Sequence, residues 1–133
     1  MRSLTTLIII SIALTSCSET KTNDPTESYK YWSGVNPPDD LKLLKGSYWQ
    51  SAHWTKEYIL YLKVKPTEKW WSEFVKQNKL LIDNGEWVKP SDSPDWFQPS
   101  KEAEVYKSTD DFYDSRFFKD KITGEFYIYV IQL

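Results

Sequence analysis

The last nine residues of the chain, 125–133 (EFYIYVIQL), place the strongest constraint on its fold. As an extended strand they carry bulky apolar or aromatic side chains on both faces, with Phe126, Ile128 and Val130 on one and Tyr127, Tyr129 and Ile131 on the other. A strand that buries both faces belongs in the interior of a sheet that is covered on two sides. The sequence therefore predicts a central C-terminal strand.

A second strand is predicted over 58–65, where Tyr58, Leu60, Leu62 and Val64 alternate with more polar positions. We expect the face that these four residues share to point into the core. Residues 41–51 fit either a strand interrupted at Gly46 or a short helix followed by a strand, and we favour the extended form. Weaker patterns predict extended segments over 102–108 and 115–119. The Asp83-Asn84-Gly85 turn signal allows a further short strand within 80–88.

One helix is predicted over 68–78. Thr67 is a favourable N-cap residue, and Glu68 places negative charge in the first helical turn. Apolar residues follow at helical spacing, namely Trp70, Trp71, Phe74 and Val75. We expect this face to pack on the sheet.

These elements predict the α+β class, with a single antiparallel sheet of about five strands and one main helix packed on one face. The globular domain is expected to span 29–133. One helix covers one face of a sheet, so the second face needs another cover. Either the sheet curls on itself, or the segment from Tyr29 to Trp32 and the proline-rich loop cover it.

That loop, 89–102 (KPSDSPDWFQPSKE), contains three prolines, so no helix or sheet interior is expected there. It nevertheless carries Trp96 and Phe97, which either plug the domain or contact a partner. Plugging is the interpretation we favour. The chain also has seven Trp, nine Tyr and six Phe. Most are expected to be core, but Trp87, Trp96 and Phe97 are candidate ligand-binding residues that could form a stacking platform for a glycan.

The composition excludes several classes of function. A formal net charge of −2 gives no basic face for nucleic acid. His53 is the only histidine and Cys17 the only cysteine, so a zinc site or a catalytic triad is not expected. No glycine-rich phosphate loop occurs. The sequence predicts a non-enzymatic protein without metal or cofactor, although paired carboxylates would suffice for a glycoside hydrolase.

The sequence contains two acidic clusters that could suggest calcium sites. Asp92 and Asp95 form one, and residues 110–114 contain the other. Neither has the alternating carboxylates, central glycine and terminal glutamate of a calcium loop. Solvated loop carboxylates are the simpler interpretation.

The N-terminus has the features of a secretory signal: a basic start at Arg2, then a short apolar run over 4–14. The run is shorter than the ~20 residues that span a bilayer. It ends in Leu14-Thr15-Ser16-Cys17, which resembles the lipobox of bacterial lipoproteins. The resemblance implies a signal peptide over 1–16, cleavage before Cys17, and attachment of fatty acyl groups such as palmitate to Cys17.

Residues 18–28 are polar, and with Cys17 they are expected to form a lipidated flexible tether over 17–28. In lipoproteins similar to those of enteric bacteria, Asp after the acylated cysteine favours inner-membrane retention. Ser18 therefore predicts the outer membrane, with the domain in the cell envelope, either in the periplasm or at the surface.

Two further segments carry a resemblance. Residues 94–99 (PDWFQP) and 121–130 (KITGEFYIYV) look like a small uncharacterised family of bacterial lipoproteins, and the layout is similar to immunity-type proteins that neutralise toxins. The predicted function is a non-catalytic, membrane-anchored lipoprotein that binds a protein or envelope partner. The alternatives are a carbohydrate- or peptidoglycan-binding module and an immunity-type inhibitor.

Overall fold

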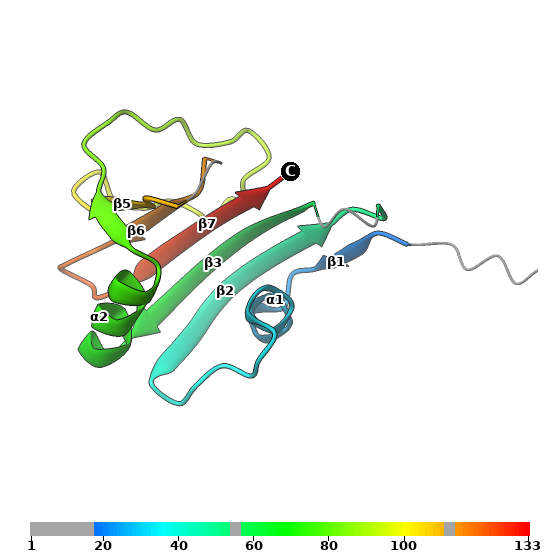
Figure 1. Ribbon diagram of the computed structural model, residues 1–133, viewed down its shortest axis with the longest axis horizontal. Helices are drawn as coiled ribbons and strands as arrows, with labels where there is room; N and C mark the ends of the chain where they lie inside the picture. The colour runs from blue at the N-terminus through cyan, green and yellow to red at the C-terminus, as the bar shows by residue number, and fades with distance from the viewer. Residues whose placement is uncertain (1–17, 54–56, 111–113) are drawn as a thin grey trace, which may run out of the picture.

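The computed structural model describes residues 18–53, 57–110 and 114–133. In chain order its elements are β1 (Thr20–Thr22), α1 (Pro25–Ser33), β2 (Leu41–Gln50), β3 (Tyr58–Pro66), α2 (Glu68–Gln77), β4 (Leu80–Ile82), β5 (Glu104–Ser108), β6 (Arg116–Lys119) and β7 (Phe126–Gln132). They form one seven-stranded antiparallel sheet in the order β1-β2-β3-β7-β6-β5-β4 (Figure 1). The signal peptide and the acylation of Cys17 fall outside the described residues.

The expected α+β class and the antiparallel sheet are confirmed. The expectation of about five strands and one main helix is wrong, because the described chain has seven strands and two helices. The two elements without a predicted counterpart, β1 and α1, both come from the N-terminal segment. Strand β7 lies between β3 and β6, as expected for a strand that is apolar on both faces.

Helix α1 begins inside the segment 18–28 that composition predicted to be disordered, and it continues to Ser33. Asp24 is the N-cap, and its Oδ1 accepts a hydrogen bond of 2.8 Å from the Glu27 N–H. Pro25 occupies the start of the helix, where its missing N–H costs no hydrogen bond. Gly34 ends the helix at φ +76°, a conformation that glycine adopts without steric cost. We expected a flexible tether over 17–28 and a domain that begins at residue 29. The structure corrects this boundary, because ordered structure begins at Thr20.

The docking of α1 depends on Gly46 in the middle of β2. A Cβ atom at this position would lie 2.6 Å from the Pro25 Cα and 3.0 Å from the Ser28 Oγ. The helix thus rests directly on the strand backbone, and Ser28 is fully buried in the contact. In the sequence pattern Gly46 looks like an interruption of a strand. In the structure the strand continues through Gly46, and the missing side chain lets the backbone of α1 approach the strand closely.

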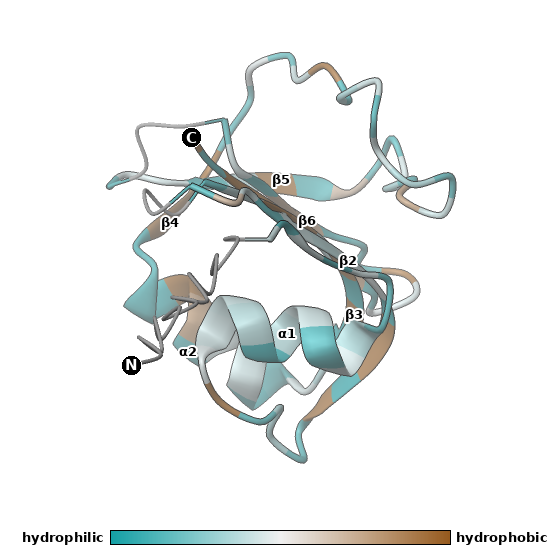
Figure 2. Ribbon diagram, turned by 90° about the vertical axis from the view of Figure 1, so that its right-hand side faces the viewer, coloured by the Kyte–Doolittle hydropathy of each residue, from teal (hydrophilic) through white to brown (hydrophobic). Residues whose placement is uncertain are grey.

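Both helices lie on the same face of the sheet (Figure 2). Helix α2 begins at its predicted N-cap, where the Thr67 Oγ1 accepts a hydrogen bond of 3.2 Å from the Trp70 N–H. Trp71 and Phe74 are buried as expected, whereas Trp70 is only partly buried. The core on this side, which we call the helix-face core, is formed by side chains of both helices with the sheet residues Leu60, Leu62, Val64, Phe117, Phe126 and Ile128.

The long loop between β4 and β5 covers the opposite, second face (Figure 2). Phe97 is fully buried there, with its ring centroid 5.0 Å from that of Tyr61 and 5.4 Å from that of Tyr127. The Tyr61 hydroxyl donates a hydrogen bond of 3.2 Å to Asp92, which ties the loop to the sheet. The prediction that the loop plugs this face is confirmed. The residues from Tyr29 to Trp32 cover the helix face instead, so their assignment to the second face is wrong.

A short ion pair fixes the far edge of the sheet. The Arg116 Nε donates to the Asp83 Oδ2 at 2.8 Å, and both side chains are about nine-tenths buried. Burial raises the pKa of the Asp83 carboxyl, but a hydrogen bond from the Gly85 N–H and the Arg116 guanidinium outweigh it, so this pKa is lowered overall. The pair joins the end of β4 to the start of β6.

Candidate functional site

The three aromatic residues that the sequence proposed as ligand-binding lie together on the second face, where Phe97 is part of the core and Trp87 and Trp96 are partly buried against it. Phe97 is fully buried and has no surface to offer a ligand, which corrects its candidacy. Trp87 packs against Phe118 and Tyr129, with ring centroids 5.0 and 5.7 Å apart, and Trp96 packs against Phe97. Their edge-to-face and tilted contacts are those of packed interiors rather than of a flat stacking platform.

A cavity of about 530 Å³ does open beside Trp87. Lys89, Gln98 and Lys101 line it together with Trp87 and Phe118. Most of its wall comes from the single loop between β4 and β5. The Trp87 Nε1 is buried with no hydrogen-bond partner among the described residues. We regard this cavity as secondary, because a more varied set of elements converges on the helix face.

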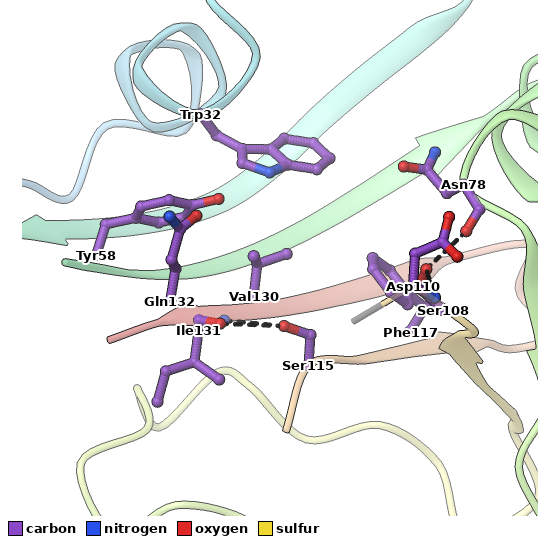
Figure 3. A pocket seen from close by; sticks show the side chains of 10 residues that line it. All are labelled: Trp32, Tyr58, Asn78, Ser108, Asp110, Ser115, Phe117, Val130, Ile131 and Gln132. Carbon is purple, nitrogen blue, oxygen red and sulfur yellow. Dashed lines mark hydrogen bonds between the residues drawn. The ribbon is translucent and has the colours of Figure 1, made fainter. Parts of the chain in front are cut away.

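The helix-face cleft is a space of about 390 Å³ between α1, the end of α2 and strand β7. Separate parts of the chain contribute side chains to it, among them Trp32 from α1, Tyr58 from β3, Asn78 after α2, Asp110 after β5, and Gln132 from β7 (Figure 3). Ser108, Ser115, Phe117, Val130 and Ile131 complete its lining. Volumes of this order hold small ligands in other proteins.

The apolar part of the cleft consists of an aromatic wall and an aliphatic floor. The Trp32 indole lies over Val130 in the view of Figure 3. It packs edge-to-face against Tyr29, with ring centroids 5.9 Å apart, and its centroid lies 6.2 Å from that of Phe74. These contacts hold the indole in place while part of its surface remains on the cleft.

Polar groups lie at two ends of the cleft. Tyr58 and Gln132, which are register partners on β3 and β7, occupy one end. Asn78 and Asp110 occupy the other. The Asn78 Nδ2 donates to the Phe74 carbonyl at 2.9 Å, which orients this amide and leaves its oxygen as the acceptor.

The supporting contacts around these groups are local. The Ser108 hydroxyl donates to the Asn78 carbonyl at 2.9 Å, which fixes the chain at the end of α2. Asp110 forms an exposed ion pair with Lys79 at 3.0 Å. Ser115 bridges to β7, since its Oγ accepts a hydrogen bond of 3.0 Å from the Ile131 N–H.

This arrangement suits binding better than chemistry. Among the described residues that line the cleft, Asp110 supplies the single carboxylate, so a facing pair of carboxylates for glycoside hydrolysis is not assembled there. His53 is exposed and does not line the cleft. Within residues 18–53, 57–110 and 114–133, no group of three His, Cys, Asp or Glu side chains is placed to hold a metal ion. Neither described helix is long and apolar enough to cross a bilayer.

No family model matches the chain, and no match was found among curated proteins or solved structures. The geometry of the cleft and the pattern of the N-terminus are therefore the features that point to a function. Trp32, Tyr58, Asn78 and Gln132 were not singled out by the sequence as site residues. No local motif marks them, because they lie far apart in the chain and meet only in the folded domain.

Proposed function

We propose that this protein is a non-catalytic lipoprotein, anchored to the membrane by acylated Cys17, that binds an envelope partner through the helix-face cleft. The cleft is the observation that carries the binding role. It joins an immobilised indole, an aliphatic floor and hydrogen-bonding groups at two ends, which is the usual composition of a ligand site.

A glycan is the partner that this composition favours. Sugar rings present C–H groups to an aromatic wall such as Trp32, while their hydroxyls pair with carboxylate and amide groups. Asp110, Asn78 and Gln132 supply those groups around the cleft. The Asp110 carboxylate is paired with the Lys79 ammonium at 3.0 Å, so this end of the cleft offers no unpaired charge that would favour an ionic ligand. A neutral, hydroxyl-rich segment of peptidoglycan fits these requirements, and a protein segment is the second candidate.

The cleft is tested by titrating the protein with soluble peptidoglycan fragments and following tryptophan fluorescence. Gln132→Ala removes an exposed amide at one end of the cleft without touching the core. Loss of one hydrogen bond, about 0.5–1.5 kcal/mol, predicts binding weaker by roughly 2–10-fold. Gln98→Ala is the matched control, because it removes an exposed glutamine on the second face.

Equal affinities for the two variants would refute the cleft as the binding site. If the wild-type protein binds no fragment at all, the glycan proposal is wrong. Capture of a protein from detergent-solubilised envelope by wild type, and not by Gln132→Ala, would then favour the second candidate.

The anchor rests on the lipobox resemblance of residues 14–17 and on the apolar run before it. Two or more acyl chains anchor firmly, at ~0.8 kcal/mol per buried CH₂ group. Metabolic labelling with a fatty-acid probe should mark the wild-type protein and not Cys17→Ala. A labelled Cys17→Ala variant would refute the lipobox interpretation. Fractionation of the envelope then tests the outer-membrane location that Ser18 predicts, and recovery mainly with the inner membrane would contradict it.

A further inference from the structure

We infer that the end of the domain that carries the helix-face cleft is held against the lipid headgroup layer, so that the cleft takes its ligand at the membrane surface. This inference rests on the proposed acylation of Cys17. It follows from how little chain separates Cys17 from the first strand, and from which residues lie in register with that strand.

The chain between anchor and fold is very short. Strand β1 begins at Thr20, which leaves Ser18 and Glu19 between it and Cys17. Even fully extended, three residue steps span at most about 11 Å. The start of β1 is therefore confined close to the acyl chains, and a domain on so short a connection has little freedom to turn its other end to the membrane.

The register of the sheet then places the cleft relative to that point. Thr20 pairs with Gln50, Gln50 pairs with Tyr58, and Tyr58 pairs with Gln132, so these residues form one row across β1, β2, β3 and β7. Neighbouring strands lie about 4.8 Å apart, which puts Tyr58 roughly 10 Å and Gln132 roughly 14 Å from Thr20. The Tyr58–Gln132 end of the cleft consequently lies within about 25 Å of the Cys17 backbone.

The opposite end of the sheet points away from this row. Strand β3 runs from Tyr58 to Pro66, a length of about 26 Å at 3.3 Å per residue. Near Pro66 lie the start of α2 and the turn that joins β6 to β7, where Ile122 is 89% exposed. Residues at this distal end should remain clear of the headgroups.

The charges of the described residues beside the Thr20 row do not supply an alternative attraction. Glu19 and Glu57, which are chain neighbours of Thr20 and Tyr58, offset Lys21. A polybasic patch would be needed to draw this surface onto anionic lipids. The short connection therefore sets the orientation, and the orientation should persist when salt screens surface charges.

The orientation is measured on the full-length acylated protein in lipid vesicles that contain a headgroup-linked fluorescence quencher. Cys17 is the only native cysteine and is blocked by acylation, so one introduced cysteine can be labelled selectively. Ala52→Cys places the label at an exposed position just beyond Gln50, beside the anchored row. Ile122→Cys places it at the distal turn and serves as the matched control. We expect quenching several-fold stronger at position 52 than at position 122, at low and high salt alike.

A second variant isolates the cause. A flexible Gly/Ser insertion of roughly twelve residues between Ser18 and Glu19 adds about 19 Å of reach, and it should bring the two quenching values close together. Melting temperatures of the labelled variants verify that both remain folded. A difference that survives the insertion would overturn the claim that the short connection orients the domain.

The outcomes separate this inference from the proposed function. If wild-type protein takes up no fatty-acid probe, the anchor and the orientation are both refuted. If the protein is acylated and positions 52 and 122 are quenched equally, the orientation is refuted while the anchored binding function stands.

Discussion

Replacing Gly46 with alanine should loosen helix α1 from strand β2. The added Cβ would lie 2.6 Å from the Pro25 Cα, and 3.0 and 3.1 Å from the Oγ and Cβ of Ser28. Carbon atoms in ordinary contact are ~3.5–4.0 Å apart, so the helix backbone has to move by about 1 Å. Pro25 contributes a backbone atom to the clash, and no side-chain rotation relieves it.

The cost follows from two opposed effects. Overpacking of a close contact costs about 1–3 kcal/mol. Alanine also reduces the conformational entropy of the unfolded chain relative to glycine, which stabilises the folded protein by about 0.4–1 kcal/mol. The free energy of unfolding should therefore fall by about 1–2 kcal/mol. For a domain of this size that corresponds to a decrease of roughly 4–8 °C in Tm.

Thermal unfolding of the acylated protein in detergent, followed by circular dichroism, measures this loss. Gly85→Ala is the control, because Gly85 is exposed in a turn and its added Cβ would meet a single side-chain atom, the Asp83 Oδ1 at 3.2 Å, and no backbone atom. Hydrogen exchange reports α1 separately, and its amides should exchange faster in Gly46→Ala. If Gly46→Ala melts no lower than Gly85→Ala, the close approach at Gly46 does not hold α1 on β2.

Four further outcomes are expected. Phe74→Ala should lower the free energy of unfolding in denaturant by ~3–5 kcal/mol, since Phe74 is 7% exposed in the helix-face core; a loss under about 1 kcal/mol would contradict its burial. Phe97→Ala should cost a similar ~3–5 kcal/mol, and an unchanged melting curve would mean that the loop does not plug the second face. Asp83→Asn should lower the free energy of unfolding by about 1.5–3 kcal/mol at neutral pH, because it weakens the ion pair with Arg116. Folding lowers the pKa of Asp83, so the stability that the carboxylate contributes is present above its unfolded pKa and is lost as the pH falls through its folded pKa. The difference in stability between variant and wild type should therefore disappear in acid, and a difference that persists there would contradict this. Burial raises the pKa of Tyr129 to about 12. The stability that its neutral hydroxyl contributes is present below its unfolded pKa and is lost as the pH rises through its folded pKa. Tyr129→Phe should therefore resist alkaline unfolding better than wild type, and equal resistance would contradict this.

The elements that the sequence predicted well are those whose signals lie in consecutive residues. Alternation over 58–65 and over 125–133 predicted β3 and β7, and the capping residue Thr67 with the apolar spacing after it predicted α2. Such signals reflect backbone geometry, in which strand side chains alternate and helical neighbours recur every three to four residues. The double-sided apolar pattern of β7 also predicted its interior place in the sheet.

Helix α1 was missed although its capping signals are also local. Asp24, Pro25 and Gly34 mark its ends, but the polar composition of 18–28 predicted disorder. A helix this short is marginal alone. It is held by the burial of Tyr29 and Trp32 and by the close approach at Gly46, which are contacts with distant strands.

The roles of the aromatic residues and the site itself were decided only by tertiary structure. Composition could not tell whether Trp96 and Phe97 were core or binding surface, because both uses call for the same large apolar side chains. The cleft joins Trp32, Asn78 and Gln132, which meet because α2 crosses from β3 to the far edge of the sheet and the chain then returns to β7. Local sequence determines which backbone conformation a segment prefers, whereas the order in which strands pair determines which side chains share a cavity.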